Sequence, residues 1–349
     1  MTEPEKNAYI LIRRKLVSSR AELARKLGIS RPTASTVCES LLQQNLIKEC
    51  GKGKSTGGAT PTLLAANNTC PGIIGIDFGY TDKMSAVLLD GAGNITAQQE
   101  TTFSPSDRKS ITEQASFLIG ELRKKTAVNG VALALSAIID EKTRKVQRSI
   151  NPLFCDESLF TQLRDLVQLP VFIANRSRAA AVSEAFGGAA DKEENFALIS
   201  LGRSVGAAFW CNGKLFCGAG SAAGEIRNLH LADGERLEDA LAKDKIRSLE
   251  DLLEKCSDAL RQLIDIMDFK LLVLSGRFAD FGREFAPLLE KKLDCDVKIR
   301  LAEFGRYSAA RGSAFLMAEE LIGCVLNNAE KIKKYSPAGA TRRRSLSKR

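Results

Sequence analysis

Apolar segments that run into glycine-containing loops recur along this chain and restrict its fold more than any other feature. Such segments lie at 72–82, 196–206 and 271–276, and a further glycine-rich stretch lies at 218–226. Strands that alternate with helices and end in glycine loops are typical of α/β proteins, because glycine lets the backbone approach a ligand closely. The spacing of these units predicts an α/β protein with two related lobes around a cleft.

The first of these segments predicts a loop that faces phosphate. Asp77, Gly79 and Thr81 follow its apolar residues. Glycine permits close backbone approach, threonine donates a hydrogen bond, and aspartate can organise a metal ion or water. Strands at 84–89, 95–102 and 130–135 and a helix at 110–127 are predicted to follow.

Residues 8–48 carry the signals of three helices. The first is predicted at 8–16. The second begins at Ser19, whose spacing to Glu22 is that of a capping box, and it ends at Gly28, which suits a left-handed residue. Its predicted buried stripe consists of Ala21, Leu23, Ala24 and Leu27.

The third helix has the features of a DNA-recognition helix. Ser30 caps it, Pro32 lies in its first turn, and Val37, Leu41 and Leu42 form its inner face. A helix, a glycine turn and a second helix present the latter to the major groove, where short polar side chains reach bases and phosphates. The predicted contacts are Arg31, Thr33, Ser35 and Thr36.

A wing is predicted after this helix. Strands at 46–50 and 62–65 are joined by a loop rich in glycine and lysine. We expect Lys52 and Lys54, at its tip, to contact phosphate or the minor groove. The alternative is a helical interaction module with a glycine linker.

The charge of the chain is concentrated at its ends. The net charge is +9, and residues 1–70 hold eleven Lys/Arg against five Asp/Glu, whereas residues 330–349 hold eight against one. Basic ends favour a polyanion such as double-stranded DNA. The alternative is that they only aid solubility. Residues 331–349 are predicted to be a disordered tail that adds nonspecific DNA affinity.

The apolar runs are too short to span a membrane, and no signal peptide follows the polar residues 1–7. We therefore expect a cytoplasmic protein without membrane contacts.

Taken together, the segments resemble the ROK family (repressors, open reading frames and kinases), which has the actin-like ATPase fold. The likeness covers essentially the whole chain and includes the winged helix-turn-helix of the repressor branch. It implies a DNA-binding domain at 1–70, a sugar-kinase-like domain at 71–330 and the basic tail. The lobes of the kinase-like domain are then expected at about 71–173 and 174–330.

The resemblance also implies a vestigial nucleotide site. The family's first loop reads Asp-x-Gly-Gly-Thr-Lys, and here Tyr80 and Asp82 replace the second glycine and the lysine. The implied vestigial residues are Asp77, Gly79, Thr81, Gly202, Gly206 and Gly276.

Catalysis is not expected. Arg176 stands where the family has the aspartate that takes the proton from the sugar hydroxyl, and a guanidinium cannot act as a base at neutral pH. The family's zinc motif is also lost, since Asn228 replaces its histidine and no cysteine follows until Cys256. We therefore expect no enzyme activity, no cofactor and no metal.

A ligand cleft is nevertheless predicted. The resemblance and the charges select Asn175, Arg176, Arg178, Glu225, Asn228 and Glu238. Arg176 and Arg178 are expected to form a cationic floor for an acidic or phosphorylated sugar. A neutral sugar and the absence of any small ligand are the alternatives.

The sequence thus predicts a transcriptional regulator, with repression as the favoured output, for carbohydrate-related genes. A homodimer or higher oligomer would match a palindromic operator, and a sugar or sugar phosphate would shift its DNA affinity. The alternatives are an active sugar kinase with a DNA-binding arm and a ligand-independent DNA-binding or scaffold protein.

Overall fold

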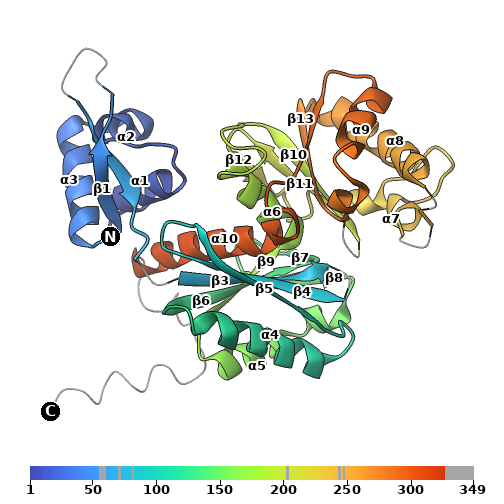
Figure 1. Cartoon of the computed structure of the whole chain (residues 1–349), viewed down its shortest axis with the longest axis horizontal. Helices are drawn as coiled ribbons and strands as arrows, with labels where there is room; N and C mark the ends of the chain where they lie inside the picture. Colours follow the sequence, from blue (N-terminus) through green and yellow to red (C-terminus); the bar gives the residue numbers. More distant parts are fainter. Residues whose placement is uncertain are drawn as a thin grey trace.

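The N-terminal module consists of three helices and an antiparallel pair of strands (Figure 1). The helices are α1 (Glu3–Arg13), α2 (Arg20–Leu27) and α3 (Arg31–Gln43), and the strands are β1 (Ile47–Lys52) and β2 (Thr62–Ala66). This is the predicted order of elements.

The computed structural model describes residues 1–54, 60–69, 72–80, 82–201, 204–242, 245–246 and 248–326. Predictions for the tip of the wing, for Thr81, for Gly202 and for the tail at 331–349 lie outside these residues.

Side-chain caps set the bounds of α2 and α3 as predicted. The Ser19 hydroxyl accepts a hydrogen bond from the backbone N–H of Glu22 at 3.3 Å, and Ser30 caps α3 in the same way. Gly28 ends α2 with a φ of 65°. The Glu22 carboxylate accepts from the backbone N–H of Ser18 at 2.7 Å rather than from Ser19, so the capping box is incomplete.

Two local predictions in this module are wrong. The first helix begins at Glu3 rather than at residue 8, because Thr2 and Glu5 form a capping box and Pro4 fits the first turn. Ala21 is exposed, whereas Leu23 and Ala24 are buried in the core of the module. Only one narrow face of the short helix α2 therefore packs inward.

The first lobe contains a five-stranded sheet of order β5-β4-β3-β6-β9. Strands β3 (Gly72–Tyr80), β4 (Lys83–Leu89) and β5 (Ile95–Thr102) are antiparallel, whereas β6 (Val128–Leu135) and β9 (Val171–Asn175) run parallel to β3 and to each other.

The outer face of this sheet is covered by α4 (Arg108–Arg123) and α5 (Glu157–Val167), which share one apolar core with it. A small hairpin of β7 (Ala137–Ile139) and β8 (Val146–Ser149) and the short 3-10 helix η1 (Pro152–Cys155) extend the lobe.

The second lobe repeats this plan with the order β12-β11-β10-β13-β14. Strands β10 (Phe196–Leu201), β11 (Val205–Cys211) and β12 (Lys214–Phe216) are antiparallel, and β13 (Leu271–Gly276) and β14 (Lys298–Leu301) are parallel to β10 and to each other. The prediction of two related α/β lobes is confirmed.

The outer face of the second sheet is covered by elements that share one apolar core. They are η2 (Ile226–Asn228), α7 (Leu237–Ala240), α8 (Leu249–Met267), η3 (Arg277–Phe281) and α9 (Phe285–Leu293).

Two helices lie between the sheets: α6 (Arg176–Ala185) and α10 (Ser308–Leu326), the latter preceded by η4 (Gly305–Tyr307). Their apolar residues pack with residues of both sheets in one core. Helix α10 packs on β3 and β6 of the first sheet. The predicted division of the lobes at residue 174 is therefore wrong in one respect, since the chain returns to the first lobe after completing the second.

Glycine permits this close packing. A Cβ on Gly75 of β3 would lie 1.8 Å from the carbonyl oxygen of Ala310 in α10. A Cβ on Gly312 of α10 would lie 1.6 Å from the carbonyl oxygen of Ala179 in α6. Real side chains do not tolerate such distances, so α10 lies against both neighbours with its backbone.

Each described helix is too short or too polar to cross a lipid bilayer.

Gly312→Ala is expected to lower the free energy of unfolding by about 1–3 kcal/mol, because the new methyl group overpacks the central layer. The control is Gly120→Ala in α4, where a Cβ meets nothing within 4 Å. That change should stabilise the protein by about 0.5–1 kcal/mol, since alanine is the better helix former. Denaturant titration of both variants measures the difference, and equal effects would contradict the packing argument.

Candidate functional site

Arg176 bonds to both lobes from the first turn of α6. Its Nε donates to the two carboxylate oxygens of Asp77 on β3 at 2.9 and 3.0 Å, and its Nη1 donates to the Ser200 hydroxyl on β10 at 2.6 Å. All three residues are buried. The guanidinium is thus satisfied within the protein and connects the two sheets across the cleft.

The Arg176 side chain also fills the loop predicted to face phosphate. A Cβ placed on Gly79 would lie 2.0 Å from Arg176 Cδ, so the space that this glycine leaves open holds the arginine stem. Asp77 in turn accepts a hydrogen bond from the backbone N–H of Gly79 at 2.8 Å. The Asp77 carboxylate therefore has an internal cation as its partner.

Arg178 forms a second connection between the lobes. Its Nη1 donates to Glu141 Oε1 at 2.8 Å in the first lobe, and its Nη2 donates to the carbonyl oxygen of Ser221 at 2.7 Å in the second. It does not line the cleft that contains Arg176. Residues two apart on a helix point to different sides, so the predicted pair cannot form one floor.

The prediction of a cationic floor made of Arg176 and Arg178 is therefore wrong. Both guanidinium groups are buried and used in bonds between the lobes.

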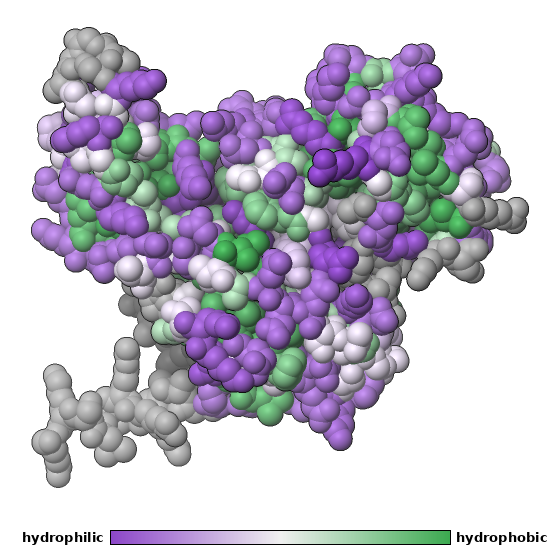
Figure 2. Space-filling view, in the orientation of Figure 1, coloured by the Kyte–Doolittle hydropathy of each residue, from purple (hydrophilic) through white to green (hydrophobic). Residues whose placement is uncertain are grey.

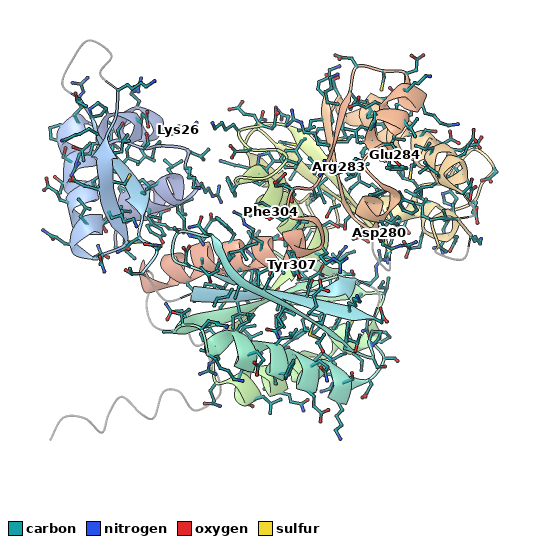
Figure 3. All side chains as sticks on the ribbon, viewed as in Figure 1. Lys26, Asp280, Arg283, Glu284, Phe304 and Tyr307 are labelled. Carbon is teal, nitrogen blue, oxygen red and sulfur yellow. The ribbon has the colours of Figure 1, made fainter. Side chains whose placement is uncertain are left out.

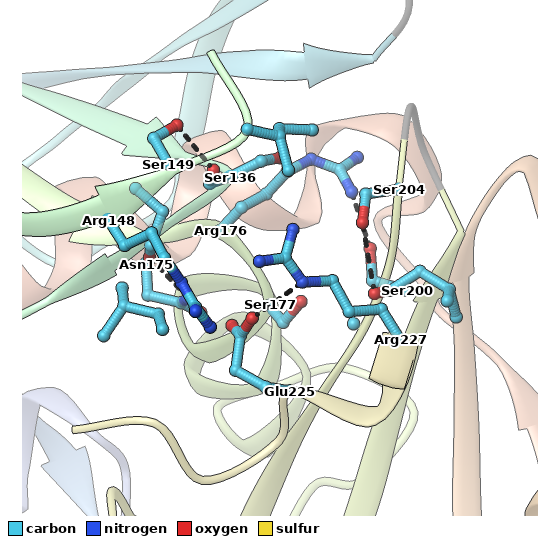
Figure 4. A pocket seen from close by; sticks show the side chains of 15 residues that line it. Ser136, Arg148, Ser149, Asn175, Arg176, Ser177, Ser200, Ser204, Glu225 and Arg227 are labelled. Atoms are coloured by element: carbon cyan, nitrogen blue, oxygen red, sulfur yellow. Dashed lines mark hydrogen bonds and ion pairs between the residues drawn. The ribbon is translucent and has the colours of Figure 1, made fainter. Parts of the chain in front are cut away.

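A cleft does lie between the lobes beside Arg176 (Figure 4). Its volume is about 40 Å³, which is room for a few water molecules. The residues that line it come from β7, β8, β9, α6, β10, β11 and η2 and from the residues that adjoin these elements. They are Ser136, Ala137, Ile138, Arg148, Ser149, Ile150, Asn175, Arg176, Ser177, Ser200, Ser204, Val205, Gly206, Glu225 and Arg227.

Sequence reasoning missed the cations that do face this cleft. Arg148 is exposed on β8, and Arg227 follows the predicted Glu225 in the short helix η2. Arg227 Nε lies 3.1 Å from Glu225 Oε2. Arg227 could have been found from its place two residues after Glu225, whereas nothing in the sequence around Arg148 distinguishes it from an ordinary surface arginine.

The other predicted ligand residues are divided between the cleft and its surroundings. Asn175 and Glu225 line the cleft, although Asn175 also caps α6 by accepting the backbone N–H of Arg178 at 3.0 Å. Glu238 does not line the cleft, but it accepts a hydrogen bond from the hydroxyl of Ser204, which does, at 2.6 Å. Asn228 is exposed and is not among the residues that line the cleft.

The vestigial glycines lie where backbones approach closely. Gly206 faces α6, since a Cβ there would lie 2.8 Å from the Ser177 hydroxyl. Gly276 has a φ of 76° and no space for a side chain beside the Leu201 carbonyl. Both glycines are therefore required by the packing of the protein itself.

The predicted DNA-contact residues lie at the start of α3. Arg31, Thr33 and Thr36 are exposed and Ser35 is half-buried. The Thr36 hydroxyl donates to the Pro32 carbonyl at 3.2 Å. On the face drawn in Figure 2, the outer edge of this module carries mainly hydrophilic side chains.

Lys52 is placed differently from the prediction. Lys52 ends β1 and its Nζ donates to the Thr62 hydroxyl at 2.9 Å, so it lies at the base of the loop rather than at its tip. Lys54 follows and is exposed.

Comparison with known proteins agrees with this architecture. Residues 73–237 match the ROK family. The match spans β3 to the start of α7 and so includes Asp77, Arg176 and the cleft.

Curated relatives with a similar sequence are repressors. A xylose repressor of Bacillus spizizenii is 29% identical over 216 residues, 60% of this chain and 56% of the relative. The transcriptional dual regulator NagC of Escherichia coli is 23% identical over 224 residues, 62% of this chain and 55% of NagC. The chain thus matches a little over half the length of these relatives.

Solved structures share the fold. A ROK family transcriptional regulator described as a homologue of the Escherichia coli Mlc protein has a TM-score of 0.70 at 16% identity, with 91% of this chain and 96% of that chain covered. A ROK family glucokinase of Streptomyces griseus has a TM-score of 0.62 at 18% identity, with 70% of this chain and 98% of the glucokinase chain covered.

Asp77→Ala is expected to lower the free energy of unfolding by about 3–5 kcal/mol, because it leaves Arg176 charged, buried and without its partner. Adding Arg176→Met should recover most of this loss, since no charge then remains in the site. Asp239→Ala, which breaks an exposed ion pair with Arg236, should change the urea concentration at the midpoint of unfolding only slightly. Urea titration measures all three, and a double variant no better than Asp77→Ala would contradict the pairing.

Proposed function

We propose that this chain is a DNA-binding transcriptional regulator, a repressor of carbohydrate-related genes, whose kinase-like domain does not transfer phosphate. The observation that carries the proposal is the exposed first turn of α3. Arg31 and Thr33 are exposed there, at the start of the second helix of the helix-turn-helix. Such a turn can reach the base edges of the major groove while Lys52, at the end of β1, and Lys54, after it, contact phosphate.

The charge of the module supports binding to DNA. Residues 1–70 carry eleven basic and five acidic side chains. Within the described residues, Arg31 has no hydrogen bond or ion pair, so its guanidinium is available to a base or a phosphate. We propose residues 1–70 as the DNA-binding domain, 71–330 as the kinase-like domain and 331–349 as a basic tail.

The burial of Arg176 supports the proposal that the kinase-like domain does not transfer phosphate. It stands where a kinase of this family has its base, and it occupies the space above Gly79. The base position itself therefore holds no group that can take a proton from a sugar hydroxyl.

The proposed effector is a sugar or a sugar phosphate in the cleft, with Arg148 and Arg227 as the cations that face it. The names of the related xylose and N-acetylglucosamine repressors support a carbohydrate ligand. A cleft of about 40 Å³ requires the lobes to separate before a sugar enters. Separation would strain the bonds from Arg176 and Arg178 to both lobes, and this gives the ligand a means to shift the conformation. We propose that the regulator acts as a homodimer in the cytoplasm.

Arg31→Ala with Thr33→Ala is expected to weaken binding to specific DNA by about tenfold or more, because base and phosphate contacts of α3 are lost. The control is Lys292→Ala, which removes one exposed positive charge on α9, far along the chain from the module. Fluorescence anisotropy on the DNA upstream of the gene, in a series of salt concentrations, measures affinity. Wild-type binding that is erased by moderate salt and indifferent to sequence would overturn the proposal.

ATP consumption by the purified protein is expected to stay at the background rate with a panel of hexoses, pentoses and N-acetylated sugars. The reason is that Arg176 cannot serve as the base. A coupled spectrophotometric assay, with a ROK family glucokinase as the positive control, makes the measurement. Sugar-dependent turnover that follows the protein through purification would favour an active kinase with a DNA-binding arm.

A further inference from the structure

The N-terminal module contacts the body through the end of α1. Arg14 makes a bidentate ion pair with Glu319 of α10, at 2.6 and 2.5 Å. Arg13 Nε and the Tyr9 hydroxyl both donate to the Gly91 carbonyl, in the turn between β4 and β5, at 3.2 and 3.3 Å. The two parts therefore meet in a defined arrangement.

A cavity of about 220 Å³ lies at this junction. Its walls come from the end of α1, from the turn after β4, from the segment after α6 and from α10. The lining residues are Arg13, Arg14, Lys15, Ala92, Gly93, Asn94, Ile95, Phe186, Gly187, Asp191, Phe304, Arg311 and Phe315. Phe304, labelled in Figure 3, lies just before η4 and α10.

The cavity has cations in excess of anions. Arg13, Arg14, Lys15 and Arg311 line it, and among the described lining residues Asp191 is the only acid. Glu319 already accepts hydrogen bonds from Nε and Nη2 of Arg14. Asp191 accepts a hydrogen bond from the backbone N–H of Gly187 at 3.0 Å.

Arg13, which lines this cavity, has a buried donor without a partner. The residue is 3% exposed, and its buried Nη1 has no hydrogen-bond partner. A buried guanidinium nitrogen without a partner is costly, and such groups are normally satisfied. Glu319 and Asp90 of the body lie near enough to stabilise its charge, but among the described residues neither forms an ion pair with it.

A second buried guanidinium lies on the same aromatic ring. The Cζ atoms of Arg13 and Arg311 lie 4.2 and 4.7 Å from the ring centroid of Phe315. Burial, opposed by Glu184 and aided by the nearby Arg13, lowers the pKa of Arg311 to about 10. Burial also lowers the pKa of Arg13. Both cations would gain from an anion between the module and the body.

We infer that this cavity is a binding site for a small molecule that carries an oxyanion, either a phosphate or a carboxylate. The guanidinium groups of Arg13 and Arg311 and the ammonium of Lys15 supply the charge. The rings of Phe186, Phe304 and Phe315 supply apolar walls for the body of the ligand. The site is separate from the cleft between the lobes, and it does not depend on the proposed function.

The chain contains a built-in reporter for this site. Trp210 is the single tryptophan, and its ring lies 5.5 Å from that of Phe186, edge to face, so a change around Phe186 alters its surroundings. The first experiment is a fluorescence titration of the full chain with inorganic phosphate and, separately, with citrate, at constant ionic strength kept by sodium chloride. We expect a saturable change and a melting temperature that rises with ligand concentration by mass action.

Two variants give opposite predictions. Arg13→Met removes the charge but keeps an apolar stem, and it should raise the half-saturating concentration about tenfold or more, as expected for lost charge-assisted hydrogen bonds. Asp191→Asn keeps the acceptor for Gly187 but removes the acid, and it should lower that concentration. Lys292→Met, on α9, should leave it unchanged.

Each outcome decides the inference. A response to phosphate but not citrate, or the reverse, identifies the oxyanion. A response that equal additions of sodium chloride reproduce, or one that Asp191→Asn weakens, would overturn the site. Because Asp191 is exposed, that variant tests the site even where Arg13→Met fails to fold.

Discussion

The first turn of α6 joins the two lobes through buried charge. Arg176 reaches Asp77 in one sheet and Ser200 in the other, and Arg178 reaches Glu141 on one side and Ser221 on the other. Buried guanidinium groups keep such bonds because losing a partner is far more costly than losing an exposed one. The cleft lies beside these contacts, and the Arg176 side chain fills the space above Gly79.

The same arrangement also fills the loop after β3. The Arg176 side chain occupies the space above Gly79 and pairs with Asp77, and this contact holds the lobes together. A ligand that prefers separated lobes must act against these bonds, so its binding energy is coupled to the shape of the whole domain.

Local sequence signals predicted the helices and strands well. Contacts between residues that lie far apart in the sequence could not be predicted in this way. Ser19, Ser30 and Gly28 act within a few residues, so their roles could be read from spacing. The partners of Arg176 and Arg178 lie tens of residues away, and no periodicity reveals them. The predicted cationic floor failed for this reason. The return of α10 to the first sheet was also missed, because apolar residues lie on all sides of this helix and so do not indicate which sheet it covers.

The position of α10 in the chain has a consequence for synthesis. Its glycine-lined contact with β3 completes the core of the first lobe, yet residues 308–326 are made after the entire second lobe. The inner face of the first sheet must therefore remain uncovered while more than a hundred further residues leave the ribosome. The lobe that is translated first is the last to close its core, and until then its apolar strands are exposed to chaperones and to neighbouring nascent chains.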